Sequence, residues 1–507
     1  MKITPLRIFL AAILLINVGV LYYLYHLQLQ IDKNEAINNQ QRALSDRNSD
    51  SVTFIIREFE EFDNEVLSII SNIAATFPRD DILVVADKLP YPPIDLHLFK
   101  NVKVVVLKPD SPGLPLFETR PENFIHKSNV VLVPDGVRID TRENLKKLVR
   151  IMRDKFVDSF GNIRIAAAGI TPGFLTPAGT KFDLQRWTLQ HSLCHRSVCD
   201  SVLSDAVLAM RREDFLALSN PFLRPIKHAL FIQTSLNRWK VYIADGIEFE
   251  RKPRQLYAAD SHVKWKHETR EAERLRRVYE EFGVKKVIDV GGDEKMFGCG
   301  KTTARCFGTV INDMPEYIYA NRWTPPCCLK GLRETAAYVI RALEESGVRY
   351  WLEGGSLLGA ARNEDIIPWD YDVDIGIYLE DIPKCKNLKS VQDDGGIVDE
   401  NDYVWQRSDV KEGHFFRVQY SETNHLHVDI FPFYSKNGIM TKKYWFKSHR
   451  QDREFPEKFL QPMTKIKFAG IEASAPNNVR EFLEYKFGAG VIENPKYPNS
   501  KQVDTYH

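Results

Sequence analysis

A glycine-serine turn followed closely by alternating acidic residues places the strongest limits on how this chain can fold. Residues 351–359 read WLEGGSLLG, and residues 367–376 read IPWDYDVDIG. An apolar strand that ends in this turn, with Ser356 opening a short helix, would bring backbone N–H groups and a hydroxyl together where a phosphate can bind. On a strand, Asp372 and Asp374 lie on one face, and two carboxylates on one face suit Mg²⁺.

Each half of this pattern is common on its own, but their order is more specific. A strand, a Gly-Ser turn, a helix and then an Asp-x-Asp strand form the layout of nucleotidyltransferase-type phosphotransfer sites. That layout calls for a third carboxylate on a later strand. Residues 425–433, HLHVDIFPF, alternate as a strand does and place Asp429 there. The sequence therefore predicts a site with three carboxylates.

These segments also resemble a known family. The matching phrases, in chain order, are WLEGGSLLGAAR, IIPWDYDVD, FFRVQYSE, NHLHVD and KFGAGVIENP. They are similar to the LicD-type phosphotransferases, and most of all to the fukutin-like branch of that family, whose members move a phospho-alcohol from a CDP carrier to a sugar. The phrases RWTPPCC and REFEEFDN extend the resemblance over nearly the whole chain.

The resemblance implies a ribitol-5-phosphate transferase of the Golgi apparatus. Such an enzyme transfers ribitol 5-phosphate from CDP-ribitol to the ribitol-phosphate-primed O-mannosyl glycan of alpha-dystroglycan and releases CMP. It is expected to form a homo-oligomer through its N-terminal domain and to work beside fukutin-type partner enzymes. Two alternatives stay open: a phosphotransferase for another CDP-alcohol, such as CDP-glycerol or CDP-choline, and a catalytically silent Golgi scaffold that binds the glycan.

The carboxylates predict the mechanism. Mg²⁺ held by Asp372 and Asp374 can position the donor diphosphate and stabilise its charge while an acceptor hydroxyl attacks in line. Asp429 is the third predicted catalytic residue, either as a metal ligand or as the base that accepts the hydroxyl proton.

Several other polar residues are predicted to contact the substrate. They are Gly355, Ser356, Arg362, Asp370, Arg417, His425 and His427. The two arginines suit bidentate binding of phosphate, although ordinary ion pairs would also explain them. Asp370 either shares the face of the acidic pair or caps the turn before it. The two histidines share a face with Asp429, yet packing alone would account for both.

Length and charge set the wider limits. A chain of 507 residues with 44% hydrophobic composition is long enough for two domains with ordinary cores. The net charge of +1, with no block of like charge, argues against general affinity for nucleic acid.

The N-terminal segment predicts a membrane anchor. Residues 8–28 contain an uncharged apolar run, IFLAAILLINVGVLYYLY and beyond, that is long enough to cross a bilayer core of about 30 Å. Positive charges in residues 1–7 favour a cytosolic tail, and therefore a type II signal anchor with a lumenal catalytic domain. A cleaved signal peptide is the alternative, but no cleavage site closes the run. Residues 29–51 are polar and are expected to act as a tether.

Residues 52–290 predict an α/β stem domain. Apolar strands alternate with helical patterns over this region. The expected strands are 52–57, 82–86, 102–107, 130–133 and 163–168, and the expected helices are 63–76, 141–156 and 267–282. The region resembles a glycosyltransferase-like nucleotide-sugar fold, but where such folds carry a metal-binding acidic pair only Asp135 is present. A non-catalytic stem or assembly role follows, with Asp135 as a turn residue.

Residues 291–507 are then the α+β catalytic domain, nucleotidyltransferase-like and LicD-type, with a cysteine-rich loop at 299–328. The spacing of Cys299, Cys306, Cys327 and Cys328 leaves disulfides and a zinc site both open. The family resemblance implies that all four are structural Zn²⁺ ligands. Cys194 and Cys199 could pair with each other, but the sequence leaves their disulfide state open, and Cys385 is expected to be a buried or idle thiol.

Overall fold

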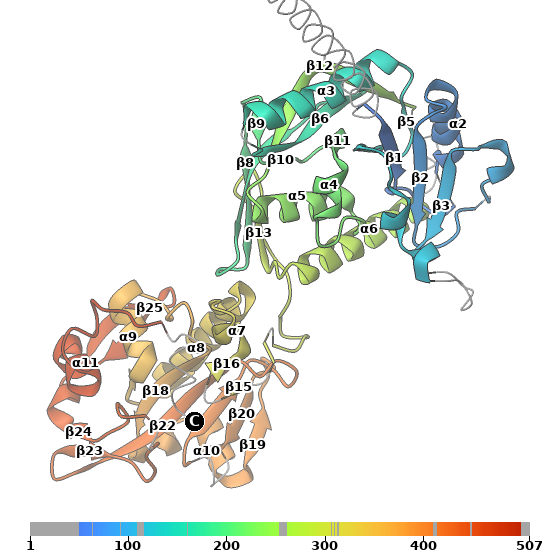
Figure 1. Ribbon diagram of the computed structural model, residues 1–507. Helices are drawn as coiled ribbons and strands as arrows, with labels where there is room; N and C mark the ends of the chain where they lie inside the picture. Colours follow the sequence, from blue (N-terminus) through green and yellow to red (C-terminus); the bar gives the residue numbers. More distant parts are fainter. Residues whose placement is uncertain are drawn as a thin grey trace, which may run out of the picture. The chain divides into compact units, whose positions relative to one another are not determined.

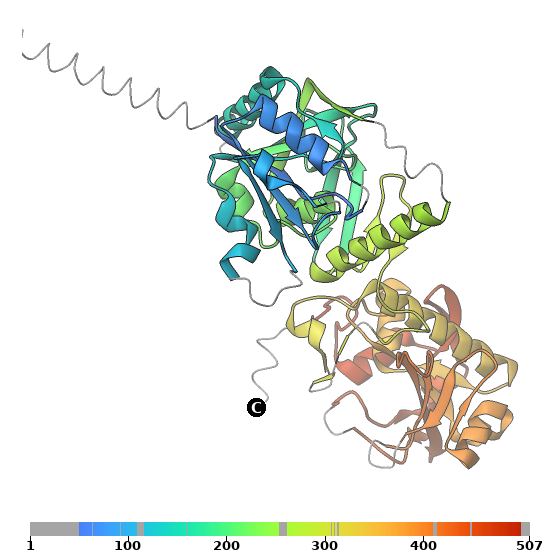
Figure 2. The same ribbon diagram turned by 90° about the vertical axis from the view of Figure 1, so that its right-hand side faces the viewer.

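The structure, a computed structural model, describes residues 50–497 except 63, 92, 109–115, 160, 253–260, 306, 309, 312–313, 409–412 and 447–448. The predicted anchor and all of the predicted tether except residues 50 and 51 therefore lie outside the described residues. Within the part that is described, no helix is long and apolar enough to cross a membrane. The chain forms two compact units, which Figures 1 and 2 show from two sides.

The first unit comprises the described residues up to Gly179 together with Leu193–Leu275. It is built on a twisted mixed sheet with the strand order β3-β2-β1-β4-β11-β6-β12-β5, and β9 pairs with β12. The strands are β1 (Val52–Ile56), β2 (Asp81–Ala86), β3 (Val102–Val106), β4 (Asn129–Leu132), β5 (Val137–Arg138), β6 (Ile163–Thr171), β9 (Val198–Cys199), β11 (Val207–Arg211) and β12 (Lys240–Arg251). All five strands predicted from apolar runs are present in this one sheet.

Helices cover both faces of the first sheet, which is why its central strands are apolar throughout. They are α2 (Val66–Thr76), α3 (Arg142–Asp158), α4 (Arg212–Leu216), α5 (Ile226–Leu236) and α6 (Ser261–Glu281). Phe54 and Ile56 of β1 share a core with apolar residues of α2 and α3, whereas Ile55 shares the opposite core with residues of α4 and α5. Parallel pairing of β1 with both β2 and β4 makes the first unit a doubly wound α/β layer.

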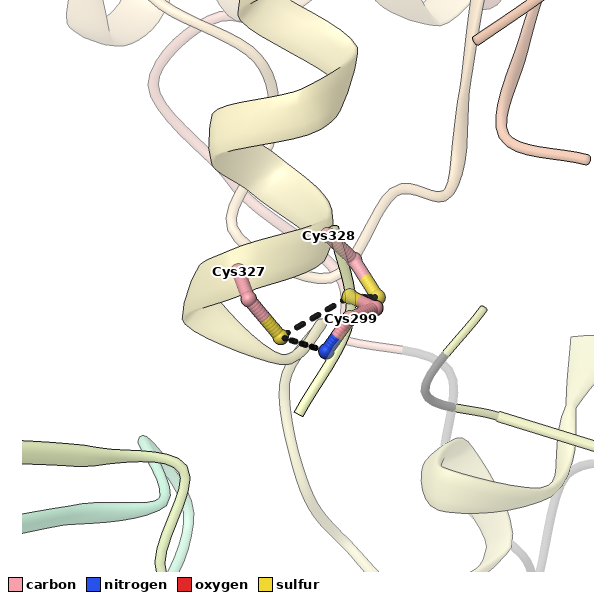
Figure 3. A group of neighbouring side chains, drawn as sticks. All are labelled: Cys299, Cys327 and Cys328. Atoms are coloured by element: carbon pink, nitrogen blue, oxygen red, sulfur yellow. Dashed lines mark hydrogen bonds between the residues drawn. The ribbon is translucent and has the colours of Figure 1, made fainter. Parts of the chain in front are cut away.

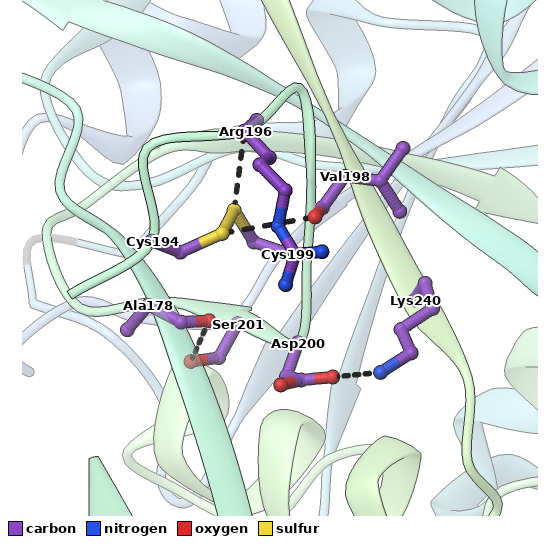
Figure 4. Close-up of a disulfide and its surroundings, with 8 residues drawn as sticks. All are labelled: Ala178, Cys194, Arg196, Val198, Cys199, Asp200, Ser201 and Lys240. Carbon is purple, nitrogen blue, oxygen red and sulfur yellow. Dashed lines mark hydrogen bonds and ion pairs between the residues drawn. A yellow bond between two sulfur atoms is a disulfide. The ribbon is translucent and has the colours of Figure 1, made fainter. Parts of the chain in front are cut away.

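In the first unit, the structure settles the disulfide question that the sequence left open and confirms the turn role of Asp135. Cys194 and Cys199 form a disulfide, next to the Asp200–Lys240 ion pair (Figure 4). Asp135 lies in the turn between β4 and β5, where its Oδ1 accepts the backbone N–H of Glu65 at 2.9 Å. Asp135 therefore has a structural role: it holds Glu65, the residue just before α2.

The second unit comprises Thr180–Ser192 and the described residues from Arg276 onward. The boundary between the units thus falls before residue 290, and a segment of the expected stem belongs to the second unit. The segment carries parts of β7 (Pro177–Asp183) and β8 (Thr188–Leu193), and β8 pairs with β13 (Lys286–Ile288), which in turn pairs with β14 (Glu294–Met296). A short strand β10 (Ser201–Val202) pairs with the start of β7.

The main sheet of the second unit has the order β17-β18-β22-β21-β20-β19, with β23 between β22 and β24. The strands are β17 (Tyr350–Leu352), β18 (Asp372–Tyr378), β19 (Gly396–Val398), β20 (Val404–Arg407), β21 (Phe416–Gln419), β22 (His427–Lys436), β23 (Ile439–Thr441) and β24 (Phe455–Pro456). Two small hairpins accompany this sheet: β15 (Val310–Ile311) with β16 (Met314–Pro315), and β25 (Thr464–Phe468) with β26 (Ile471–Ala475).

Helices pack against this sheet and against one another. They are α7 (Glu316–Tyr319), α8 (Pro326–Glu345), α9 (Gly354–Asn363), α10 (Lys386–Asp394) and α11 (Val479–Phe487). Buried residues of α8, such as Leu332 and Val339, share one core with Val373 and Ile375 of β18. Because side chains alternate along a strand, this packing leaves Asp372 and Asp374 on the other face.

Candidate active site

The predicted carboxylates meet on two neighbouring strands of the second unit, β18 and β22. Asp374 on β18 is in register with Asp429 on β22, which is in register with Arg417 on β21. In the adjacent row, Asp372 is in register with His427. Residues opposite one another on neighbouring strands project from the same face, so these side chains converge at one end of the sheet.

The Gly-Gly-Ser turn lies directly against the carboxylates. Helix α9 begins at Gly354, two residues before the predicted start at Ser356. The Ser356 hydroxyl accepts the backbone N–H of Asp374 at 2.8 Å and so ties α9 to β18. A Cβ at Gly355 would lie 2.8 Å from an Asp370 oxygen, and a Cβ at Gly354 3.2 Å from an Asp374 oxygen. The glycines are needed because acidic side chains approach the helix start this closely.

The acidic residues of the site are buried close to one another, and their pKa values are raised. Burial, followed by the nearby Asp372, raises the pKa of Asp370 well above its usual value. Burial, followed by Asp372 and Asp429, raises the pKa of Asp374 in the same way. Burial also raises the pKa of Asp372, against the opposing effect of His427. Neighbouring carboxylates that disfavour each other's charge form a site that a divalent cation would stabilise.

Arg417 and His427 flank Asp429. Arg417 donates from Nε and Nη2 to the two oxygens of Asp429 at 2.7 and 2.8 Å, a bidentate ion pair. His427 is buried, and its Nδ1 donates to the carbonyl of His425 at 2.9 Å, which leaves Nε2 facing Asp429 at 3.9 Å. Arg417 therefore orients a carboxylate, and its predicted contact with phosphate stays a prediction.

Asp370 is brought to the site as the turn alternative predicted: its Oδ1 accepts the backbone N–H of Tyr371 at 3.0 Å, and its carboxyl group lies within interaction distance of that of Asp372. Arg362 and His425 occupy other positions than expected. The Arg362 guanidinium donates to the backbone carbonyls of Val491 and Ile492, so it anchors the C-terminal segment. His425 precedes β22, is exposed, and hydrogen-bonds Gln419.

A chain of buried contacts lies behind the turn, and the sequence carries almost no signal for it. The Trp351 indole donates to Glu353 at 2.7 Å, and Glu353 forms an ion pair of 2.8 Å with the buried ammonium of Lys486 on α11. A Cβ at Gly376 would lie 2.3 Å from the Trp351 ring, so only glycine fits beneath it. An acidic residue directly before the glycines was the one signal in the sequence, and nothing local pointed to Lys486.

Three of the four predicted zinc ligands cluster at the first turn of α8. The Sγ atom of Cys299 lies 2.9 Å from that of Cys327 and 3.1 Å from that of Cys328, as Figure 3 shows. Among the described residues, none of these three cysteines takes part in a disulfide. Cys306 lies outside the described residues. Cys385 is buried in the core, as expected of an idle thiol.

The donor atoms at the acidic site fit a hard divalent cation. Ligand atoms of Asp372, His427 and Asp429 all lie within 4.8 Å of one another. Asp374 is beside them in register, and carboxylate oxygens are the donors that Mg²⁺ prefers. The clustered sulfur atoms fit a softer ion, since thiolates select Zn²⁺.

A mixed sheet that carries a Gly-Ser turn, an Asp-x-Asp strand and a third carboxylate defines a nucleotidyltransferase-type phosphotransfer domain. Residues 347–478 match the family described as "LicD/FKTN/FKRP, nucleotidyltransferase domain", and residues 38–290 match "Fukutin-related protein stem domain". The chain belongs to the FKRP family of transferases, which combine these two domains.

Full-length relatives support this membership. The chain is 45% identical over 503 residues to the human protein "Ribitol 5-phosphate transferase FKRP", with 98% of each chain covered. It is 46% identical over 505 residues to the mouse protein of the same name, again with 98% of each chain covered. Human "Ribitol-5-phosphate transferase FKTN" is 33% identical over 120 residues, which cover 22% of this chain and 25% of that one.

Proposed function

We propose that this protein transfers ribitol 5-phosphate from CDP-ribitol to the ribitol-phosphate-primed O-mannosyl glycan of alpha-dystroglycan and releases CMP. The observation that carries the proposal is the row formed by Asp374, Asp429 and Arg417 beside the glycine turn, in a chain that is nearly half identical to named ribitol 5-phosphate transferases.

The acidic residues and the turn divide the work of binding the donor. Asp372 and Asp374, with Asp429, would hold Mg²⁺, which when bound supplies positive charge to orient the diphosphate and stabilise charge on the phosphoryl group in flight. At the start of α9, the backbone N–H of Gly355 would donate to a phosphate oxygen, whereas the N–H of Ser356 already donates to the carbonyl of Glu353 at 3.1 Å. The positive end of the helix favours the same anion.

In this proposal Asp429 acts as a ligand rather than as the base. Both oxygens of Asp429 already accept hydrogen bonds from Arg417, which holds the carboxylate in a fixed orientation beside Asp374. A phosphate oxygen of the donor would lie near this pair of Arg417 and Asp429. The main role of Arg417 would thus be to position the carboxylate of Asp429, and contact with the donor would be a lesser role.

We propose further that Cys299, Cys306, Cys327 and Cys328 bind one structural Zn²⁺. The support is the close approach of three sulfur atoms from a loop and the first turn of α8. A closed four-thiolate site would fix the loop to the helix and thereby stabilise residues around 300. The ion has no open position for catalysis.

The proposed setting is the Golgi membrane, with residues 8–28 as a type II anchor, the catalytic domain in the lumen and a homo-oligomer formed through the stem. The apolar run with its positive N-terminal flank supports the anchor. The Cys194–Cys199 disulfide supports an oxidising compartment.

The test is CMP release by the purified chain in the presence of CDP-ribitol, CDP-glycerol or CDP-choline, with Mg²⁺ or with EDTA. The acceptor is a phosphorylated O-mannosyl glycopeptide that already carries one ribitol phosphate. Of the three donors, we expect only CDP-ribitol to give CMP release. This release should depend on Mg²⁺ and be lost in Asp374→Asn. Release only with another donor would overturn the substrate. Silence with every donor, while the glycopeptide still binds, would replace the enzyme by a scaffold.

A further inference from the structure

The first unit has a cavity at the place where doubly wound sheets bind ligands. The chain runs outward from β1 to β2 and β3 and then returns to β4 on the other side of β1, so the strand order reverses between β1 and β4. Crevices at the carboxyl ends of strands at such a reversal are the usual ligand sites of these folds. Residues that end β1 and β4, among them Ile55, Arg57, Leu132 and Val133, line the cavity.

The size of the cavity limits its occupant. Its volume is about 230 Å³, below the roughly 300–1,000 Å³ of typical sites for drug-sized ligands. A single monosaccharide ring suits this space better than a nucleotide sugar does. Apolar walls from Phe59, Pro225 and Phe231 would contact the C–H face of such a ring.

The charges in the wall are already matched to one another, which argues against an anionic ligand. Arg57 donates to Asp87 at 2.7 Å, and Arg224 forms ion pairs of 2.9 Å with Glu58 and 3.3 Å with Glu60. The carboxylates that line the cavity are Glu58, Glu60, Asp135, Asp205 and Glu271, and the permanent cations are Arg57, Arg224, Lys227 and Arg251. A phosphate would have to compete with internal partners for every guanidinium.

Metal-assisted binding of a diphosphate is also disfavoured. Asp135, the one acidic residue in the turn after β4, uses an oxygen to accept the N–H of Glu65. The remaining carboxylates of the wall are held by arginine and lysine side chains. A group that needs a divalent cation therefore has no ligand set here.

One buried donor in the wall requires a partner. Arg251 ends β12 and gives Nη1 to Asp205 at 2.9 Å, while its buried Nε–H has no acceptor among the described residues. Buried donors without acceptors are rare in folded proteins. A sugar hydroxyl accepts one hydrogen bond and donates another, so it satisfies Arg251 and a nearby carboxylate together.

We propose that the cavity of the first unit binds one neutral monosaccharide residue of a glycan. The paired charges would act as hydrogen-bond donors and acceptors for hydroxyls, and no step of the transfer reaction takes place there. Binding at this cavity would hold a glycan chain on the protein independently of the acidic site.

The test is ligand-observed saturation-transfer NMR on the full chain with D-mannose, D-galactose, N-acetyl-D-glucosamine and N-acetyl-D-galactosamine, each compared with mannose 6-phosphate and UDP-N-acetylglucosamine. Ala206→Leu fills the cavity, and Glu271→Gln removes one lining carboxylate without changing its volume. Glu273→Gln, on the same helix α6 but not in the cavity wall, is the matched control. Asp374→Asn reports on the acidic site.

We expect a saturation-transfer signal from at least one neutral sugar, reduced several-fold in Ala206→Leu and Glu271→Gln and unchanged in Glu273→Gln and Asp374→Asn. Three outcomes overturn the proposal: no neutral sugar gives a signal, only the nucleotide sugar or the phosphorylated sugar does, or the signal survives in both cavity variants. A signal lost in Asp374→Asn would assign the sugar to the acidic site. Since Asp374→Asn lacks turnover under the proposed function, sugar binding is scored separately from the transferase reaction.

Discussion

Carboxylates gather near strand ends in both units of the chain, but their surroundings differ. In the first unit, burial acts to raise the pKa of Glu60, yet Arg274 and Arg224 outweigh it and the pKa lies below its usual value. Burial also acts to raise the pKa of Asp87, but Arg57 and Arg224 outweigh it, and this pKa too lies below its usual value. In the second unit, burial and neighbouring carboxylates raise the pKa of Asp370 and Asp374.

The difference separates charges that stabilise the fold from charges held ready for a ligand. A carboxylate surrounded by guanidinium groups gains from ionisation and ties loops together. Carboxylates that raise each other's pKa weaken the fold unless a cation joins them, and such groups concentrate at functional sites. Removing one charge should therefore have opposite effects on stability in the two units.

The largest effect is expected from Asp374→Asn. Turnover should fall by about 1,000-fold, because the change removes charge from the proposed metal site. The melting temperature without metal should stay level or rise, since one source of repulsion is gone. CMP release and a thermal melt with EDTA measure both. Normal turnover in this variant would remove the metal site from the mechanism.

Arg224→Met should act in the reverse way. It leaves Glu58, Glu60 and Asp87 partly buried with fewer cations, at a cost of about 3 kcal/mol in the free energy of unfolding. The exposed pair of Arg153 and Asp50 offers the control, since Arg153→Met should change stability by no more than about 0.5 kcal/mol. Denaturant titration compares them, and equal midpoints would contradict the role given to Arg224.

Cys327→Ser tests the zinc proposal. Loss of one of four thiolates should remove most bound zinc and loosen the loop after Gly298, while the acidic site stays intact. Zinc content is measured by elemental analysis of the purified variant. Cys385→Ser is the matched control because Cys385 is buried but lies outside the sulfur cluster. Equal zinc in both variants would refute the assignment.

The smallest effect is expected from Asp381→Asn, a paired carboxylate of the second unit. Burial opposes ionisation, but Arg349 and Lys384 lower the pKa of Asp381 from 3.8 to about 2. A lowered pKa means that the stabilisation is complete above pH 3.8 and is lost as pH falls through about 2.

The cost of Asp381→Asn should be about 1–2 kcal/mol at neutral pH, at the lower end because Arg349 and Lys384 are half exposed. This loss of stability should vanish near pH 2. The variant should keep its turnover. Unfolding midpoints of wild type and variant across this pH range measure it. A constant difference at every pH would show that packing rather than charge explains the loss.

Local patterns in the sequence predicted the parts of the molecule that local physics controls. Apolar runs located five strands of the first sheet, and the acidic alternation placed Asp372 and Asp374 on one face. The pairing of Arg417 with Asp429 depends on the register between β21 and β22, which alternation alone does not set. Lys486 reaches Glu353 only because α11 packs near α9, a tertiary contact with no local signature.

The position of Arg362 also depends on a tertiary contact with no local signature, so its predicted phosphate contact does not match its place in the structure. Arg362 follows the glycine turn in sequence, and this nearness suggested a phosphate contact, but one helical turn is enough to redirect the side chain. Its partners, the carbonyls of Val491 and Ile492, come from the far end of the chain. His425 was placed on a strand that begins two residues later, so its side chain is not held in the row of the site.

Residues 180–192 belong to the second compact unit although chain of the first unit flanks them on both sides. Within that unit the Trp187 indole donates to the carbonyl of Trp323 at 2.7 Å, and β8 supplies the neighbour of β13. A fragment that starts at Arg276 would lack both. The two units therefore cannot be separated by a single cut in the chain. A gene fusion or a protease cut at one place would leave the catalytic unit without residues 180–192 and with an unpaired edge at β13.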